Sequence, residues 1–81
     1  MKITRTKRFT KNLNKLPEAI KKKLDKQLVY LVSDLRHPSL RAKKYDESQG
    51  IWQARIDDHF RLYFVIDSDT YVLFNILPHS D

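Results

Sequence analysis

Cysteine is absent from the 81-residue sequence, and glycine occurs only once. Without cysteine the chain has no disulfide, no thiolate nucleophile and no sulfur-ligated zinc or iron–sulfur centre. A single glycine also excludes a glycine-rich loop that cradles phosphate. The three histidines are scattered and the acidic residues cluster only in turns. We therefore expect neither a metal site nor a cofactor.

Long apolar runs are missing as well. No segment approaches the ~20 residues that a membrane span requires, and the charged start Met1–Arg5 does not resemble a signal peptide. We therefore expect a cytoplasmic protein that makes no membrane contact. The length fits a single domain, residues 1–81. A domain of this size buries about two-thirds of its unfolded surface, which leaves little room for a large ligand cavity.

Acidic side chains are fewer than basic ones. Sixteen lysines and arginines stand against ten aspartates and glutamates, which gives a formal net charge of +6 at pH 7. For a basic protein of this kind, a polyanion is the first partner to consider. A cluster of lysines in the first half of the chain, Lys21, Lys22, Lys23 and Lys26, specifies no partner by itself.

Apolar spacing predicts two helices in the first half of the chain. After a short strand over residues 2–5, Thr6 is a candidate N-cap for the first helix. The second helix starts at Pro17 and ends at His37, because the residue before Pro38 is disfavoured in helical conformation. Its apolar stripe consists of Ile20, Leu24, Leu28, Leu31 and Leu35.

Apolar and polar residues that alternate with a period of two predict three strands in the second half of the chain. They are residues 51–56, 60–66 and 71–77, separated by turns at 57–59 and 67–70. The polar stretch 39–49 is expected to be a connection. Tight turns make the strands an antiparallel meander. The expected order is β-α-α-β-β-β, an α+β domain whose antiparallel sheet is covered on one face by an N-terminal helical hairpin.

The polar face of this sheet carries two arginines in a position that favours an anion. If the first turn pairs Ile56 with Phe60, Arg55 lies directly opposite Arg61. Like charges in such a pair repel, and a bound anion removes the penalty. Phosphate fits because guanidinium groups bind it with two hydrogen bonds. The alternative is that one of the two turn aspartates neutralises one arginine.

Other polar residues are candidates for the same face. Arg41, Lys43 and Lys44 precede the sheet, either folded over the arginines or as a solvated basic loop. Tyr63 shares the parity of Arg61. His79 follows the third strand, and imidazole changes its charge near neutral pH. A one-residue slip in that strand would turn His79 to the other side.

The order of elements and three stretches of sequence resemble a known family. The stretches are Leu40-Arg41-Ala42-Lys43-Lys44-Tyr45, Gly50-Ile51-Trp52-Gln53-Ala54-Arg55-Ile56 and His59-Phe60-Arg61-Leu62-Tyr63-Phe64. Over essentially the whole chain they are similar to the RelE/ParE superfamily of bacterial toxins from type II toxin–antitoxin pairs. Within it they resemble the RelE and YoeB branch, which cleaves messenger RNA on the ribosome.

The resemblance implies roles for individual residues. Arg61 matches the strand arginine that binds the scissile phosphate, Arg55 a basic position on the adjacent strand, and His79 a C-terminal general acid or base. Lys44 matches a basic position before the sheet. The further expected RNA- or phosphate-binding residues are Lys43, Arg41 and Tyr63.

The resemblance also implies a mechanism without metal or cofactor. The 2′-hydroxyl of the substrate attacks the adjacent phosphorus and leaves a 2′,3′-cyclic phosphate. Two positions depart from the pattern: Gln53 stands where a RelE-type toxin has a lysine, and Ser80 replaces a terminal aromatic residue.

The expected function is that of a toxin that cleaves messenger RNA on the ribosome and thereby inhibits translation. The expected partners are the ribosome, the message and a cognate antitoxin whose acidic segment covers the basic face. Two alternatives share the fold, because function depends on the site and not on the architecture. They are a ParE-like inhibitor of DNA gyrase and a noncatalytic RNA-binding module.

Overall fold

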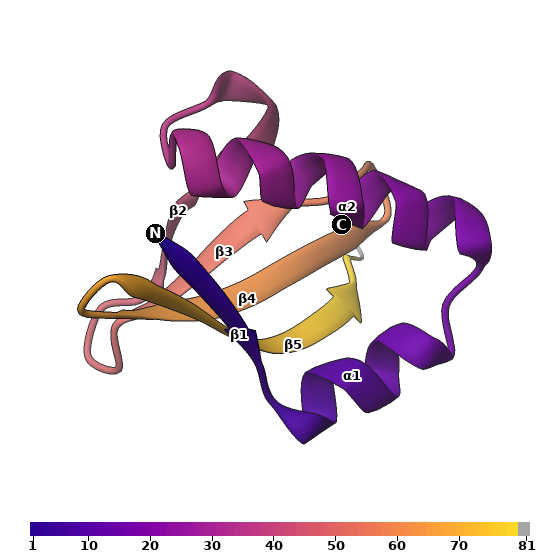
Figure 1. Cartoon of the computed structure of the whole chain (residues 1–81), viewed down its shortest axis with the longest axis horizontal. Coiled ribbons are helices and arrows are strands. Elements are labelled where there is room, and N and C mark those ends of the chain that lie inside the picture. The colour runs from indigo at the N-terminus through magenta and orange to yellow at the C-terminus, as the bar shows by residue number, and fades with distance from the viewer. Residues whose placement is uncertain (80–81) are drawn as a thin grey trace.

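Two α-helices, a short 3-10 helix and a five-stranded sheet make up the computed structural model, which describes residues 1–79 (Figure 1). In chain order the elements are β1 (Lys2–Arg5), α1 (Lys7–Asn14), α2 (Glu18–Ser33), η1 (Pro38–Leu40), β2 (Lys43–Asp46), β3 (Ile51–Arg55), β4 (Phe60–Asp67) and β5 (Thr70–Pro78). The departure noted at Ser80 lies outside the described residues. Among the described residues, no helix has the length and apolarity needed to cross a membrane.

The helices begin where the sequence predicts, but α2 ends earlier. Thr6 caps α1, since its Oγ1 accepts a hydrogen bond from the Phe9 amide at 3.2 Å. The prediction that the second helix continues to His37 is wrong: it ends at Ser33, and Asp34 takes an extended conformation. Leu35 lies beyond the end of the helix, yet it still packs against the core. Its apolar side chain therefore continues the helical spacing in the sequence although the residue itself is not helical.

The segment 39–49 is not a simple connection, as predicted, but contains the end of η1 and the whole of β2. The prediction missed β2 because the strand is polar and mostly exposed and lies at the edge of the sheet. A bulge at Tyr45 further breaks its alternation, since Lys44 pairs with Trp52 and Asp46 with Ile51.

The sheet has the strand order β1-β5-β4-β3-β2. The three C-terminal strands form the predicted antiparallel meander, and β2 adds to it in antiparallel fashion. The first strand is the exception, because β1 runs parallel to β5 with Lys2 opposite Thr70. In the view of Figure 1, α2 lies towards the top and α1 towards the bottom, and both helices pack against the same face of the sheet.

One face of the sheet and both helices share a single core. Its buried members are Phe9, Leu13, Ile20, Leu24, Leu28, Leu31, Leu40, Ala54, Ile56, Leu62, Phe64, Tyr71, Leu73 and Ile76. The buried strand residues alternate with less buried ones, as expected. In β5 a bulge at Phe74 changes this parity, so that Leu73 and Ile76 both face the helices. The opposite face of the sheet remains uncovered by helices.

Candidate active site

The two arginines lie opposite each other on the uncovered face. Arg55 pairs with Arg61 in the β3–β4 register, and the amide of Ile56 donates to the carbonyl of Phe60 at 3.1 Å. The predicted pairing across the turn is therefore confirmed. Directly paired residues point to the same side of a sheet, so two guanidinium groups are placed next to each other.

The two arginines differ in the partners of their guanidinium groups. Arg55 donates from Nη2 to the Asp58 carboxylate, and this hydrogen bond and the charge of Arg55 lower the pKa of Asp58. Arg61 donates from Nη1 to the carbonyls of Asp57, at 2.6 Å, and Phe60, at 3.0 Å. The expected aspartate partner thus exists for Arg55, whereas Arg61 forms no ion pair within residues 1–79. Arg61 is the stronger candidate for holding an anion.

A hollow of about 190 Å³ lies in front of these arginines. Its lining residues are Arg41, Lys43, Gln53, Arg55, Arg61 and His79; we call it the basic hollow. They come from the end of η1, from β2, β3 and β4, and from the residue after β5. The hollow therefore brings together five of the seven residues that the sequence singled out.

Lys44 does not join them, and the prediction that it converges with the arginines is wrong. It pairs with Trp52 on the helix-covered side, where its ammonium lies 5.3 Å from the Trp52 ring centroid. Lys43 pairs with Gln53 and faces the basic hollow instead. Lys43 lines the hollow in place of Lys44 because adjacent residues of a strand such as β2 point to opposite faces.

Tyr63 flanks the basic hollow. It pairs with Gln53, and its ring meets Tyr45 edge-on with centroids 5.1 Å apart. Burial raises the pKa of the Tyr63 hydroxyl, with a further rise from Tyr45 and an opposing effect of Arg61. The tyrosine pair extends the uncovered face away from the hollow.

His79 reaches the basic hollow because of the β5 register. Arg61 pairs with Leu77, and two residues later the His79 amide donates to the His59 carbonyl at 2.7 Å. The bulge at Phe74 decides this outcome, since it changes which side the following residues face. The predicted approach of His79 to Arg61 is thus confirmed as geometry.

The 57–59 turn holds the three central site residues. Its Asp57 carbonyl accepts from Arg61, its Asp58 carboxylate pairs with Arg55, and its His59 carbonyl accepts from His79. The Asp57 carboxylate stabilises the turn itself by accepting from the amides of His59, at 2.8 Å, and Phe60, at 2.9 Å. Each turn residue therefore fixes one member of the site.

Gln27 supports the site from α2 and was missed by the sequence reasoning. Its side chain is buried, and Nε2 donates to the carbonyls of Arg55, at 2.8 Å, and Ser39, at 3.1 Å. Its Oε1 accepts from the Ser39 hydroxyl at 3.0 Å. A signal was present, because position 27 falls within the apolar stripe and only a partnered amide is tolerated there.

The arrangement suits a polyanionic substrate and proton transfer. Guanidinium and ammonium groups stabilise negative charge that develops on phosphorus-bound oxygens, and imidazole can exchange a proton near neutral pH. Within residues 1–79 no group of three His, Asp or Glu side chains could hold a metal ion.

Solved structures of toxins share this architecture. The YoeB/ParE toxin from Agrobacterium tumefaciens superposes with a TM-score of 0.81 at 12% identity, covering 99% of this chain and 100% of that chain. The toxin of the RelB-RelE complex from Methanococcus jannaschii gives 0.76 at 20% identity, over 91% and 87% of the two chains. The intact RelBE complex from E. coli gives 0.77 at 14% identity, over 99% and 98%. At these identities the likeness establishes the fold.

Comparison with curated protein sequences gives no match. One family model does match, over residues 3–81, and it describes the ParE toxin of the type II toxin-antitoxin system parDE. The match spans nearly the whole chain and agrees with the superpositions. The chain therefore belongs to the ParE toxin family of type II toxin–antitoxin systems.

Proposed function

We propose that this toxin is a ribosome-dependent endoribonuclease that cleaves messenger RNA and so inhibits translation. The observation that carries the proposal is that Arg61, which has no ion pair within the described residues, lines the same hollow as His79. An anion-binding group next to a proton-transfer group is what RNA cleavage requires. The resemblance to the RelE and YoeB branch supports the same reading.

The proposed reaction needs only groups that the hollow and the RNA supply. The 2′-hydroxyl oxygen attacks the adjacent phosphorus and gives up its proton, while the bond from phosphorus to the 5′-oxygen breaks and that oxygen gains a proton. Arg61, Arg55 and Lys43 stabilise the negative charge of the pentacovalent phosphorane. His79 acts as the general acid or base, which contributes about 10²–10⁴-fold.

The shape of the site agrees with a substrate that is held elsewhere. A hollow of about 190 Å³ has room for little more than a phosphate and its surroundings. Positioning of the strand by the ribosome would supply the orientation that a shallow site lacks, and orientation is worth several orders of magnitude in rate. The ribosome would also offer a polyanionic surface for the basic side chains.

The proposal includes a cognate antitoxin and a cytoplasmic location. The structures from M. jannaschii and E. coli hold their toxins in complex with RelB or as RelBE. For this chain we propose an antitoxin segment rich in carboxylates that covers the basic hollow, because complementary charge favours that contact.

A translation extract tests the activity. Codon-phased cuts in the message are expected with the wild-type chain and should fall about 10²–10³-fold in Arg61→Ala and His79→Ala. Lys22→Ala is the matched control, since Lys22 is an exposed cation of α2 outside the hollow. An intact message would overturn the proposal. Halted DNA supercoiling would then support the gyrase alternative. Ribosome binding without cuts would support the noncatalytic one.

A further inference from the structure

A second hollow adjoins the basic hollow at Arg41. It measures about 230 Å³ and is lined by Leu35, Arg36, His37, Pro38, Arg41, Ala42 and Trp52; we call it the Trp52 hollow. Arg41 lines both hollows. Trp52 lies on the helix-covered side and the basic hollow on the uncovered face, so the two hollows meet at Arg41, where the chain passes from η1 to the edge strand β2.

The Trp52 hollow has the composition that receives a nucleobase. It combines an indole, an imidazole and two guanidinium groups with three apolar side chains, and no carboxylate lines it. Aromatic rings and guanidinium planes are the groups on which unpaired bases stack. A larger hollow of about 390 Å³ beside α2 is a weaker candidate, because Asp57 and Asp58 line it.

The walls of the Trp52 hollow are held in place. The Trp52 ring stacks on the core residue Phe64, with an interplanar angle of 14°. The His37 ring lies parallel to Tyr30 with centroids 3.8 Å apart, and its Nδ1 accepts from the Ser39 amide at 3.1 Å. Rigid walls reduce the entropy that is lost on binding a flat ligand.

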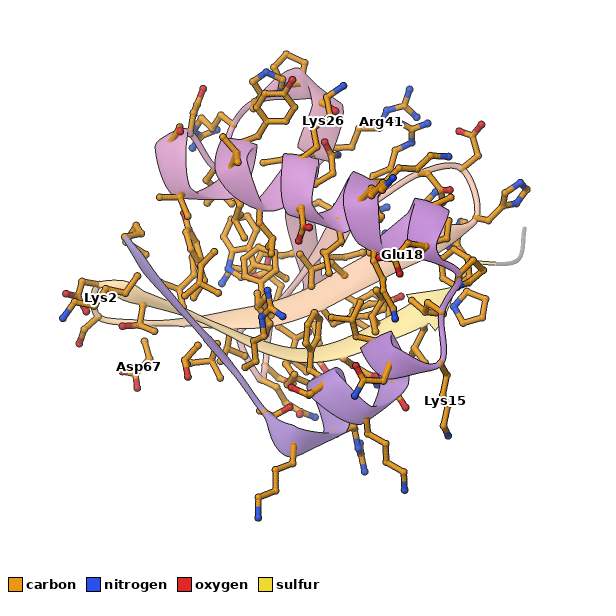
Figure 2. All side chains as sticks on the ribbon, turned by 45° about the vertical axis from the view of Figure 1, so that its right-hand side comes forward. Lys2, Lys15, Glu18, Lys26, Arg41 and Asp67 are labelled. Atoms are coloured by element: carbon orange, nitrogen blue, oxygen red, sulfur yellow. The ribbon has the colours of Figure 1, made fainter. Side chains whose placement is uncertain are left out.

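The backbone of Arg41 is unusual at the junction. Arg41 has φ 46° and ψ 41°, a left-handed conformation that is uncommon for residues other than glycine. Such positions cluster at functional sites, where the surrounding structure enforces them. Figure 2 shows Arg41 well away from Lys2 and Asp67, which lie at the other end of the sheet.

We propose that the Trp52 hollow binds a base of the RNA strand whose phosphate occupies the basic hollow, with Arg41 between base and phosphate. The inference rests on the proposed function, because it assigns this hollow the selection of the nucleotide next to the cleavage site. Arg36 and Trp52 are then specificity-determining residues, while Arg61 binds the backbone irrespective of sequence.

Trp52 provides the probe, since it is the only tryptophan in the chain. A 2′-O-methyl RNA trinucleotide, which lacks the attacking hydroxyl, is titrated against the wild-type chain in parallel with an abasic trinucleotide of equal charge. Tryptophan emission reports contact with the ring and calorimetry gives the affinity. The base-bearing trinucleotide should quench the emission and bind about five- to 150-fold more tightly than the abasic one, the range for one stacked base.

Two substitutions separate base binding from phosphate binding. Arg36→Ala should reduce the preference for the base-bearing over the abasic trinucleotide by at least about half on a logarithmic scale, and it should leave the affinity for the abasic trinucleotide unchanged. Arg8→Ala is the matched control, because Arg8 is an exposed arginine of α1. Arg61→Ala should weaken both trinucleotides equally. Equal affinity for the two trinucleotides, or equal losses in Arg36→Ala, would overturn the inference.

The outcome is distinguishable from that of the cleavage assay. If base-dependent quenching and the Arg36→Ala effect are found but the message stays intact, the base site stands and the proposed nuclease activity fails. If codon-phased cuts occur without base-dependent quenching, the activity stands and the base site fails.

Discussion

Lys43 and Lys44 are identical in type and adjacent in sequence, yet the pairing of β2 with β3 gives them different neighbours. Lys43 lines the basic hollow and Lys44 lies over the Trp52 ring. We expect Lys43→Ala to lower the cleavage rate roughly 10- to 100-fold, somewhat less than loss of a donor in a closed site. The cleavage rate of Lys44→Ala should stay within about twofold of the wild-type rate in the same translation extract. Equal losses would place both side chains at the substrate and contradict the register.

The Asp57 carboxylate makes the stability of the turn depend on pH. Burial alone would raise its pKa, but hydrogen bonds from the His59 and Phe60 amides and the Lys23 ammonium, at 3.3 Å, lower it below the ordinary value of 3.8. A group with a depressed folded-state pKa stabilises above its unfolded pKa and loses that effect as the pH falls through the folded value.

Urea unfolding at a series of pH values checks this. The difference in unfolding free energy between the wild type and Asp57→Ala should be constant above about pH 5 and shrink below about pH 4, where the carboxylate takes up a proton. A difference that grows on acidification would contradict the sign of the shift.

At the scale of elements, Gln27 ties α2 to η1 and to the end of β3. Gln27→Ala leaves two carbonyls and a hydroxyl, all partly buried, without this partner, so we expect a loss of about 1–3 kcal/mol in the free energy of unfolding. Chemical denaturation measures it, with Gln49→Ala in an exposed turn as the control. Because Gln27 holds the backbone of Arg55, cleavage should also fall in conditions where the variant is fully folded.

The elements that were predictable are those whose side chains repeat a pattern. The apolar stripe of α2 and the alternation of β3 and β4 are read directly from residue spacing. The polar edge strand β2 carries no such pattern, and its register decides which lysine reaches the hollow. The bulge at Phe74 is likewise invisible in the spacing, because Phe74 suits either face of a strand. The arginine pair was predictable, since a short turn fixes the pairing on both sides of it.

At the scale of the whole molecule, the cations behind the net charge of +6 lie in different surroundings. Side chains such as that of Lys15 project from the body into solvent (Figure 2), whereas four cations line the basic hollow. Binding of single-stranded RNA should therefore weaken with salt, and its slope against the logarithm of salt concentration should fall by about 0.7 for each hollow cation removed. Lys43→Ala should show that reduction and Lys15→Ala should not, measured by titration between 50 and 200 mM salt. Identical slopes for the two variants would mean that the RNA does not distinguish the hollow from the rest of the surface.

The parallel pairing of β1 with β5 has a consequence for the order of events during synthesis. Lys2 leaves the ribosome long before Thr70, its partner across the two strands, has been made. The first strand and the apolar stripes of both helices must therefore wait for nearly the whole chain before they are covered, and contacts of such long sequence separation form late in folding. The basic hollow, which takes residues from position 41 to position 79, is complete only at the same moment. Under the proposed function, a nascent toxin cannot cut the message from which it is being translated.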